Sequence, residues 1–162
     1  MDFLRLSPLE RQFEVERLLA RYVQCIDDDR LEDWPAFFTE HCDYRLVARD
    51  NAERGLPLAT FSCNSRGMLT DRVVALRHAN IYEAHRYRHL VGSTLLLDAS
   101  ADAIVARSHY AVFRTRTNGV SEPYSVGVYD DRIVFDAGAL RFCAKCVTFD
   151  TLRIDSLLAT PL

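Results

Sequence analysis

The dipeptide Asn118-Gly119 restricts the fold of this chain more than any other feature, because it lies between two long segments typical of β-strands. Both residues tolerate the positive φ angles of a type I′ turn, so Ile104 to Thr117 and Glu122 to Phe135 are predicted to form an antiparallel hairpin. A second turn at Asp136-Ala137-Gly138 predicts that Leu140 to Asp150 pairs back onto this hairpin. The second half of the chain therefore predicts a continuous antiparallel sheet.

Three further segments complete the predicted sheet. Within Cys42 to Arg49, the side chains of Cys42, Tyr44, Leu46 and Ala48 alternate with Asp43, Arg45, Val47 and Arg49, as expected of a strand with one buried face. Pro57 to Cys63 and Arg88 to Asp98 are the other two predicted strands. We therefore expect about six strands, a usual number for one sheet. With 162 residues, the chain is expected to form one domain over residues 1–162.

The first of three predicted helices has a well-marked start. Ser7 can cap it, Pro8 occupies a position where its missing N–H is not needed, and Glu10 completes a capping box. An apolar stripe at helical spacing follows, and the acidic run Asp27-Asp28-Asp29 ends it. The members of the stripe are Val15, Leu18, Leu19, Tyr22 and Ile26.

Two more helices are predicted before the main hairpins. Asp33 can cap a short helix that contains Trp34, Phe37 and Phe38, and a third helix should span Ser65 to Arg77. Helices followed by a long antiparallel sheet are typical of an α+β fold rather than a parallel α/β fold. We therefore predict an α+β fold.

Three N-terminal helices packed on a curved, mostly antiparallel sheet describe the cone of the NTF2-like (cystatin-like) folds. The run Trp34-Pro35-Ala36-Phe37-Phe38, followed by Tyr44, is the usual way in which this fold fills the junction between helices and sheet. We interpret these aromatic side chains as core, where burial of each contributes about 1.5–3 kcal/mol.

The composition excludes several classes of function. A net charge of −3 gives no electrostatic reason to expect nucleic acid or an anionic membrane as partner. Met1 to Phe13 lacks the apolar core of a signal peptide. The longest apolar stretch, Leu90 to Leu97, is far shorter than the roughly 20 residues that span a bilayer. The five cysteines are an odd number, which fits reduced thiols, and we expect a cytoplasmic protein.

Neither the glycines nor the cysteines form a cofactor motif. The glycines match no phosphate-binding loop. Cys143 and Cys146 have Cys-x-x-Cys spacing but lie in a predicted strand, where residues three apart face opposite sides. His85 and His89 would share one face on a helix, whereas their segment enters a predicted strand whose arginines would repel a cation. No catalytic, metal-binding or cofactor-binding residue is therefore expected in this chain.

Five polar residues leave two interpretations open: Asp71, Arg72, Arg86, Arg88 and His89. They can form a network of ion pairs, exposed or at an interface, where arginine binds carboxylates with planar geometry. Alternatively, Asp71 and His89, with Tyr44 as a further candidate, can act as acid and base in the pocket of a free-standing dehydratase or isomerase.

Several segments together resemble one protein family. The block Met68 to Arg72 and the segment Asn80 to His89, which reads NIYEAHRYRH, resemble the signature of the small (beta) subunits of Rieske-type aromatic-ring-hydroxylating dioxygenases. Trp34 to Phe38, Cys42 to Arg45 and the end from Phe149 to Leu162 match the same family. The central block is most similar to small subunits acting on aromatic acids: terephthalate first, then salicylate, anthranilate and benzoate.

The resemblance implies a structural role in the catabolism of aromatic compounds. It implies a large (alpha) subunit that holds a Rieske [2Fe-2S] cluster and a mononuclear Fe(II). It also implies a hexamer of three large and three small subunits, supplied with electrons from NAD(P)H through a separate reductase and ferredoxin. A Rieske centre needs Cys-x-His and Cys-x-x-His, and no cysteine here precedes a histidine at either spacing. The five polar residues above are then expected at a subunit interface.

Overall fold

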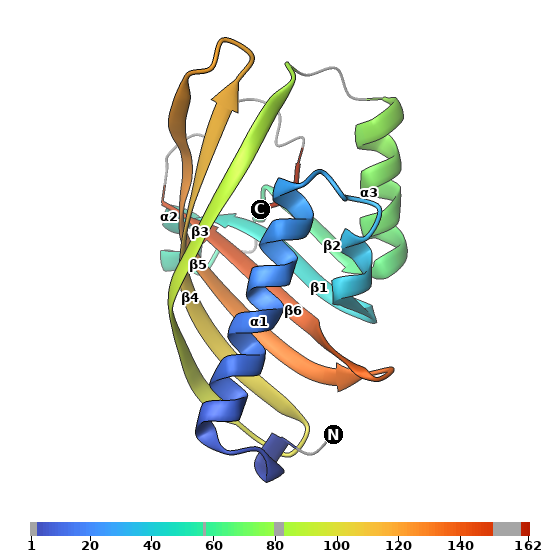
Figure 1. The fold of residues 1–162 in the computed structure, drawn as a ribbon, viewed down its shortest axis with the longest axis vertical. Helices are drawn as coiled ribbons and strands as arrows, with labels where there is room; N and C mark the ends of the chain where they lie inside the picture. Colours follow the sequence, from blue (N-terminus) through green and yellow to red (C-terminus); the bar gives the residue numbers. More distant parts are fainter. Residues whose placement is uncertain (1–2, 57, 80–82, 151–159) are drawn as a thin grey trace.

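A computed structural model describes residues 3–56, 58–79, 83–150 and 160–162. Its centre is a curved six-stranded sheet, open rather than closed into a barrel, with the strand order β2-β1-β6-β5-β4-β3 (Figure 1). The strands are β1 (Phe38–Ala48), β2 (Phe61–Ser65), β3 (His85–Ala99), β4 (Ala103–Arg116), β5 (Ser121–Asp136) and β6 (Ala139–Phe149). The predicted α+β fold with an NTF2-like sheet is confirmed.

Neighbouring strands are antiparallel except β1 and β6, which run parallel. The predicted hairpin is present as β4 and β5, and Gly119 at its turn has the positive φ of 81° that favours glycine. β6 returns beside β5, as the sequence predicts, after Ala137 and Gly138, both with positive φ. β3 and β2 are the two edges of the sheet.

Helix α1 (Pro8–Asp27) begins as its sequence predicts. The Ser7 hydroxyl accepts a hydrogen bond from the backbone N–H of Glu10, and the Glu10 carboxylate accepts one from the backbone N–H of Ser7. Its buried face matches the predicted stripe and adds two residues: Val15, Leu18, Leu19, Tyr22, Val23, Cys25 and Ile26. This face packs against the sheet, so that the end of α1 lies beside β3 (Figure 1).

The other helices differ in detail from the predictions. The short second helix is a 3-10 turn, η2 (Trp34–Phe37), and the Asp33 side chain makes no cap hydrogen bond. Helix α3 (Arg66–His78) is shifted by one residue at each end from the predicted span of Ser65 to Arg77. Ser65 caps it, and it lies against β1, β2 and η2. A 3-10 turn, η1 (Phe3–Arg5), and a short helix, α2 (Arg49–Glu53), were not predicted, and α2 has no buried residue that would create an apolar stripe.

The starts of three strands also differ, and β3 begins at His85 rather than at Arg88. β1 begins at Phe38, four residues before the predicted start, because the aromatic run continues directly from η2 into the sheet. The strand predicted for residues 57–63 is placed at Phe61–Ser65, since Ser62 and Cys63 pair with Arg45 and Tyr44 of β1. Residue 57 lies outside the described part of the chain.

The aromatic junction predicted from the sequence forms the centre of the core. Trp34, Phe38 and Tyr44 are completely buried, and their rings contact one another edge-on at centroid distances of 5.3–5.7 Å. Tyr22 from α1 joins them through contacts with Phe38 and the β6 residue Phe142. These contacts fix the end of α1 over β1 and β6. In the described part of the chain, no helix has the length and apolarity needed to span a membrane.

The core also contains a buried ion pair that the sequence did not reveal. Lys145 on β6 lies opposite Asp131 on β5, and its Nζ is 3.1 Å and 3.2 Å from the two carboxylate oxygens. Both side chains are completely buried. The ammonium group also lies 3.6 Å from the ring centre of Tyr129 and 4.7 Å from that of Tyr22. Asp131 and the two aromatic rings therefore surround the chain's only lysine.

Candidate functional site

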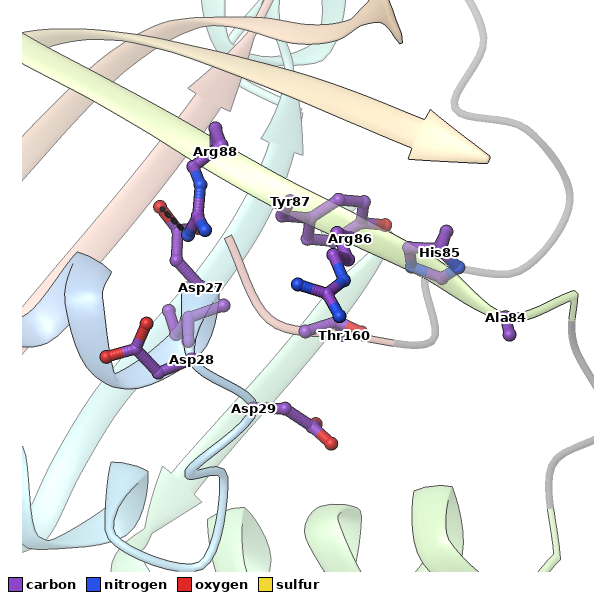
Figure 2. A pocket seen from close by; sticks show the side chains of 10 residues that line it. Asp27, Asp28, Asp29, Ala84, His85, Arg86, Tyr87, Arg88 and Thr160 are labelled. Carbon is purple, nitrogen blue, oxygen red and sulfur yellow. Dashed lines mark ion pairs between the residues drawn. The ribbon is translucent and has the colours of Figure 1, made fainter. Parts of the chain in front are cut away.

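A polar cleft of about 480 Å³ lies where the end of α1 meets the start of β3 (Figure 2). One wall is formed by residues 26–29, and the other by residues 84–88. Thr160, near the end of the chain, completes the lining. The cleft thus brings together the acidic run predicted to end the first helix and the arginine-rich block of the family signature.

Asp27 holds the two walls together. Its Oδ1 accepts a hydrogen bond from His89 Nδ1 at 2.6 Å, and its Oδ2 accepts one from the backbone N–H of His89 at 2.9 Å. Arg88 approaches the same carboxylate at 4.0 Å, an ion pair drawn as a dashed line in Figure 2. Because β3 is an edge strand, the bond to its backbone N–H satisfies a donor that no neighbouring strand reaches.

The Asp27–His89 pair has the arrangement of an acid–base dyad but lacks access. The His89 side chain is completely buried, and among the described residues its Nε2 has no hydrogen-bond partner. Asp27 is bonded to Nδ1, so Nε2 is the ring nitrogen that would have to meet a substrate. A substrate cannot contact a ring without exposed surface, so in this conformation the pair anchors α1 to β3.

The rest of the acidic run is also paired. Asp29 accepts two hydrogen bonds from Arg77 Nη1, at 2.9 Å and 3.0 Å, and Glu32 accepts from Arg77 Nε at 2.8 Å. The hydrogen bond from Arg77 lowers the pKa of Glu32, and the same bonds raise the pKa of Arg77. Within the described part of the chain, Asp28 forms only a long, exposed ion pair with Arg30. Arg77 therefore fastens α3 to the loop after α1.

Two arginines of the opposite wall keep most of their donors free. Arg88 leaves 60% of its side chain exposed, and its contact with Asp27 is at the limit of an ion pair. Arg86 is also exposed, and within the described part of the chain it makes no ion pair. Figure 2 shows its guanidinium directed toward Thr160. The cleft therefore offers two guanidinium groups to a carboxylate or carbonyl from another molecule.

The five residues predicted from the sequence do not form one cluster. Arg88 and His89 contact Asp27, and Arg86 lines the same cleft. The sequence assigned Asp27 only to the end of a helix. Asp71 lies exposed on α3 and does not line the cleft. Arg72, half-buried on the same helix, places its guanidinium 5.0 Å from the centre of the Phe61 ring. The carboxylate partner of His89 is therefore Asp27 and not Asp71.

The other candidate ligands are separated as well. The Tyr87 ring lies between the two imidazoles, with centroid distances of 4.7 Å to His85 and 6.3 Å to His89. Cys143 donates to the carbonyl of Arg132. Within the described ranges, no group of three or more His, Cys, Asp or Glu side chains has an arrangement that could hold a metal ion.

Comparison with known proteins identifies relatives over nearly the whole chain. Residues 7–145 match the SnoaL-like domain family. The chain is 46% identical to the anthranilate 1,2-dioxygenase small subunit of Burkholderia cepacia, covering 93% of both chains. It is 36% identical to subunit beta 1 of the terephthalate 1,2-dioxygenase terminal oxygenase component of a Comamonas species, covering 93% of this chain and 98% of the relative.

A solved structure agrees with these relatives. A beta subunit from Novosphingobium aromaticivorans, assigned to an aromatic-ring-hydroxylating dioxygenase, superposes with a TM-score of 0.87. It shares 43% sequence identity, and the match covers 95% of this chain and 98% of that one. The relatives are components of oxygenase complexes, so this chain is a component of an oxidoreductase. It belongs to the family of small subunits of aromatic-ring-hydroxylating dioxygenases.

Proposed function

We propose that this chain is a non-catalytic small subunit that stabilises the large subunit of a dioxygenase acting on an aromatic acid. The observation that carries the proposal is the 46% identity to an anthranilate dioxygenase small subunit over 93% of both chains. The buried dyad agrees with it, because the His89 side chain of this pair has no exposed surface for a substrate. The chain's part in ring hydroxylation is then to hold its partner in place.

The proposed partner is a large subunit that carries both metal centres, a Rieske [2Fe-2S] cluster and a mononuclear iron. Three large and three small subunits would form the particle, and a reductase would supply its electrons from NAD(P)H. The family resemblance supports this arrangement, as does the absence of Rieske ligand spacings from the sequence. We expect the complex in the cytoplasm, with an interface above about 2,000 Å², as is usual for obligate assemblies.

The cleft is the part of this surface that we assign to subunit contact. Arg86 and Arg88 project from an edge strand that Asp27 holds in place, so their backbone positions are fixed before a partner binds. Their free donors suit a carboxylate or backbone carbonyl of the large subunit. Asp71 and Arg72, on α3, would belong to a separate contact if they also lie at an interface.

The substrate is proposed to be an aromatic carboxylate, and anthranilate is favoured. The sequence signature placed terephthalate first, whereas the identity of 46% to the anthranilate relative exceeds the 36% to the terephthalate relative. Since the ring would bind in the large subunit, this preference rests on relatedness and not on a pocket of this chain.

The rival function, a free-standing dehydratase or isomerase, receives less support. It requires Asp71 and His89 to share one pocket, whereas the His89 ring is buried against Asp27 and Asp71 does not line the cleft. A solved structure of another kind, a proposed scytalone dehydratase from Novosphingobium aromaticivorans, is 16% identical, and such likeness extends to the fold alone.

Co-expression with the large subunit proposed as its partner tests the proposal. We would compare the wild type, Arg86→Ala and a matched control, Arg54→Ala, an exposed arginine at the end of α2 that does not line the cleft. The readouts are the mixed particle by size-exclusion chromatography with light scattering, and the turnover of anthranilate per assembled iron.

The proposal predicts that Arg86→Ala lowers the yield of mixed particle, while turnover per assembled iron stays at the wild-type value. Arg54→Ala should assemble like the wild type. Normal assembly of Arg86→Ala together with a collapse of turnover per iron would assign the cleft to catalysis instead. Hydration or isomerisation activity of the small subunit alone would favour the rival function.

A further inference from the structure

The sheet has an outer face, on the side away from α1, that carries exposed apolar side chains on β3, β4 and β5 (Figure 1). Side chains alternate along these strands, so that buried residues such as His89, Tyr110 and Val112 point inward and the residues between them point outward. Four large apolar side chains point outward. They are Leu90, Leu95, Phe113 and Val126, with exposed fractions of 62%, 61%, 36% and 36%.

The register of the sheet makes most of these side chains neighbours. Leu90 lies opposite Ala111 of β4, and Ala111 lies opposite Val126 of β5. Phe113 follows Ala111 by two residues, so it shares the same face. Beside Leu90, a Cβ added at Gly92 would meet no atom within 4 Å, so the strand leaves open space there. An exposed apolar patch with polar residues around it is typical of a protein–protein contact site.

The rim of this patch is basic, although the net charge of the chain is −3. The ion pair between Arg107 and Asp130 cancels within the rim, and Arg88 reaches only Asp27, at 4.0 Å. A surplus of positive charge remains, which suits a partner surface that combines apolar side chains with carboxylates. Two copies of this face laid against each other would oppose arginine to arginine. The charged residues in the outward rows from Arg86 to Asp98 are four arginines and two aspartates: Arg86, Arg88, Arg107, Arg132, Asp98 and Asp130.

The cleft alone is too small for a stable subunit contact. It is lined by 10 residues, whereas such a contact involves roughly 20–30 residues on each side. Arg86 and Arg88 alternate with Leu90 along β3, so the cleft arginines and the apolar patch belong to one continuous surface. A partner that binds these arginines is therefore expected to reach the patch as well.

We propose that the outer face of β3, β4 and β5, centred on Leu90, Phe113 and Val126, is the apolar centre of the contact with the large subunit. Because the large subunit is the partner in the proposed function, the assignment of this face rests on that function. The partner surface is then apolar at its centre, with acidic side chains around it. The open space at Gly92 accepts a side chain of the partner, and the cleft arginines form one edge of the contact.

Two substitutions by glutamate test this assignment. Leu90→Glu places a carboxylate at the centre of the patch, and Gly92→Glu does the same without removing a side chain. Leu9→Glu is the matched control, because Leu9 is an exposed leucine in the first turn of α1, where an acidic side chain suits the helix dipole. Each variant is co-expressed with the large subunit, and size-exclusion chromatography with light scattering measures the mixed particle. Near-ultraviolet circular dichroism of each isolated variant checks its fold.

Leu90→Glu and Gly92→Glu should each lower the yield of mixed particle at least about tenfold, as expected at the centre of an interface. Leu9→Glu should assemble like the wild type. The isolated small subunit should have the same mass in the wild type and in both glutamate variants.

The outcomes separate this assignment from the proposed function. A wild type that forms no mixed particle would refute the proposed function itself. Normal assembly of the wild type and of both folded glutamate variants would refute only the assignment of this face. A lower mass of the isolated Leu90→Glu or Gly92→Glu variant than of the isolated wild type would also refute it, because the face would then join copies of this chain. If Leu90→Glu does not fold, Gly92→Glu decides, and failure of both to fold would show that the fold itself needs this face.

Discussion

The buried pair of Lys145 and Asp131 allows a prediction whose size follows from its geometry. Replacing Lys145 by methionine keeps an unbranched side chain of similar length but leaves the Asp131 carboxylate without its cation. Both side chains are completely buried, so water cannot replace the lost partner. Removing one member of such a pair costs about 3–5 kcal/mol, a large share of the roughly 5–15 kcal/mol that stabilises most domains.

Urea unfolding, followed by the fluorescence of Trp34, the only tryptophan, measures this loss. For a domain of this size, the same loss lowers Tm by about 6–20 °C. The control is the double variant Lys145→Met with Asp131→Leu, which removes the stranded charge as well. It should recover most of the lost stability, because an apolar pair often replaces a buried ion pair at no net cost.

The loss should also depend on pH. Burial raises the pKa of Asp131 above its ordinary 3.8, and in Lys145→Met no cation opposes this shift. A carboxyl whose pKa is higher in the folded than in the unfolded chain stabilises the fold while it is protonated. This contribution is fully present below the unfolded-state pKa, and it is lost as the pH rises through the folded-state pKa. The deficit of Lys145→Met should therefore be larger at about pH 7 than at about pH 4. A deficit below about 1 kcal/mol at neutral pH, or one that grows on acidification, would refute the reasoning.

Three other substitutions test separate parts of the fold, each by its free energy of unfolding. Gly127→Ala would place its Cβ 2.0 Å from a carbonyl oxygen of β6, so we expect the free energy of unfolding to fall by at least about 1–3 kcal/mol. Gly92→Ala is the control, because its Cβ would enter open space, and it should change stability by less than about 0.5 kcal/mol. Asp27→Ala removes two hydrogen bonds at a buried site and should cost about 1–3 kcal/mol of unfolding free energy. Asp28→Ala, at an exposed site, is the control, and equal effects of the two substitutions would contradict the anchoring role of Asp27. Ser7→Ala should cost about 0.5–2 kcal/mol through loss of the helix cap and speed hydrogen exchange in the first turn of α1; unchanged exchange there would argue against the cap.

Local patterns predicted the elements of the fold well. The capping box at Ser7 and the glycine turn at Gly119 each depend on residues that are neighbours in sequence, and the structure has both. Helix α2 was missed because five residues without a buried face give no periodic signal. The parallel pairing of β1 with β6 joins strands about a hundred residues apart, and no local pattern encodes such a register.

The site was predicted only in part, for a related reason. The arginine block was found through resemblance, but the acidic side chain that anchors it, Asp27, is 62 residues away from His89. A weak signal was present, since Asp27 follows the buried Val23 by one helical turn and therefore faces the sheet. Lys145 gave a similar signal, as the only lysine of an arginine-rich chain within an apolar strand. Sequence alone gives no indication that Leu162 bonds to Tyr22 and Tyr44, because these contacts depend on the complete fold.

The mass of the particle formed with the large subunit tests the central claim most directly. After co-expression, native mass spectrometry gives the number of each subunit, and elemental analysis gives the iron bound to the particle and to the small subunit alone. We predict a mixed particle with equal numbers of both subunits. All of its iron should belong to the large subunit, so the small subunit alone should contain none. A small subunit that is isolated without a partner and carries stoichiometric iron, or a large subunit that assembles and turns over normally without it, would contradict a structural role.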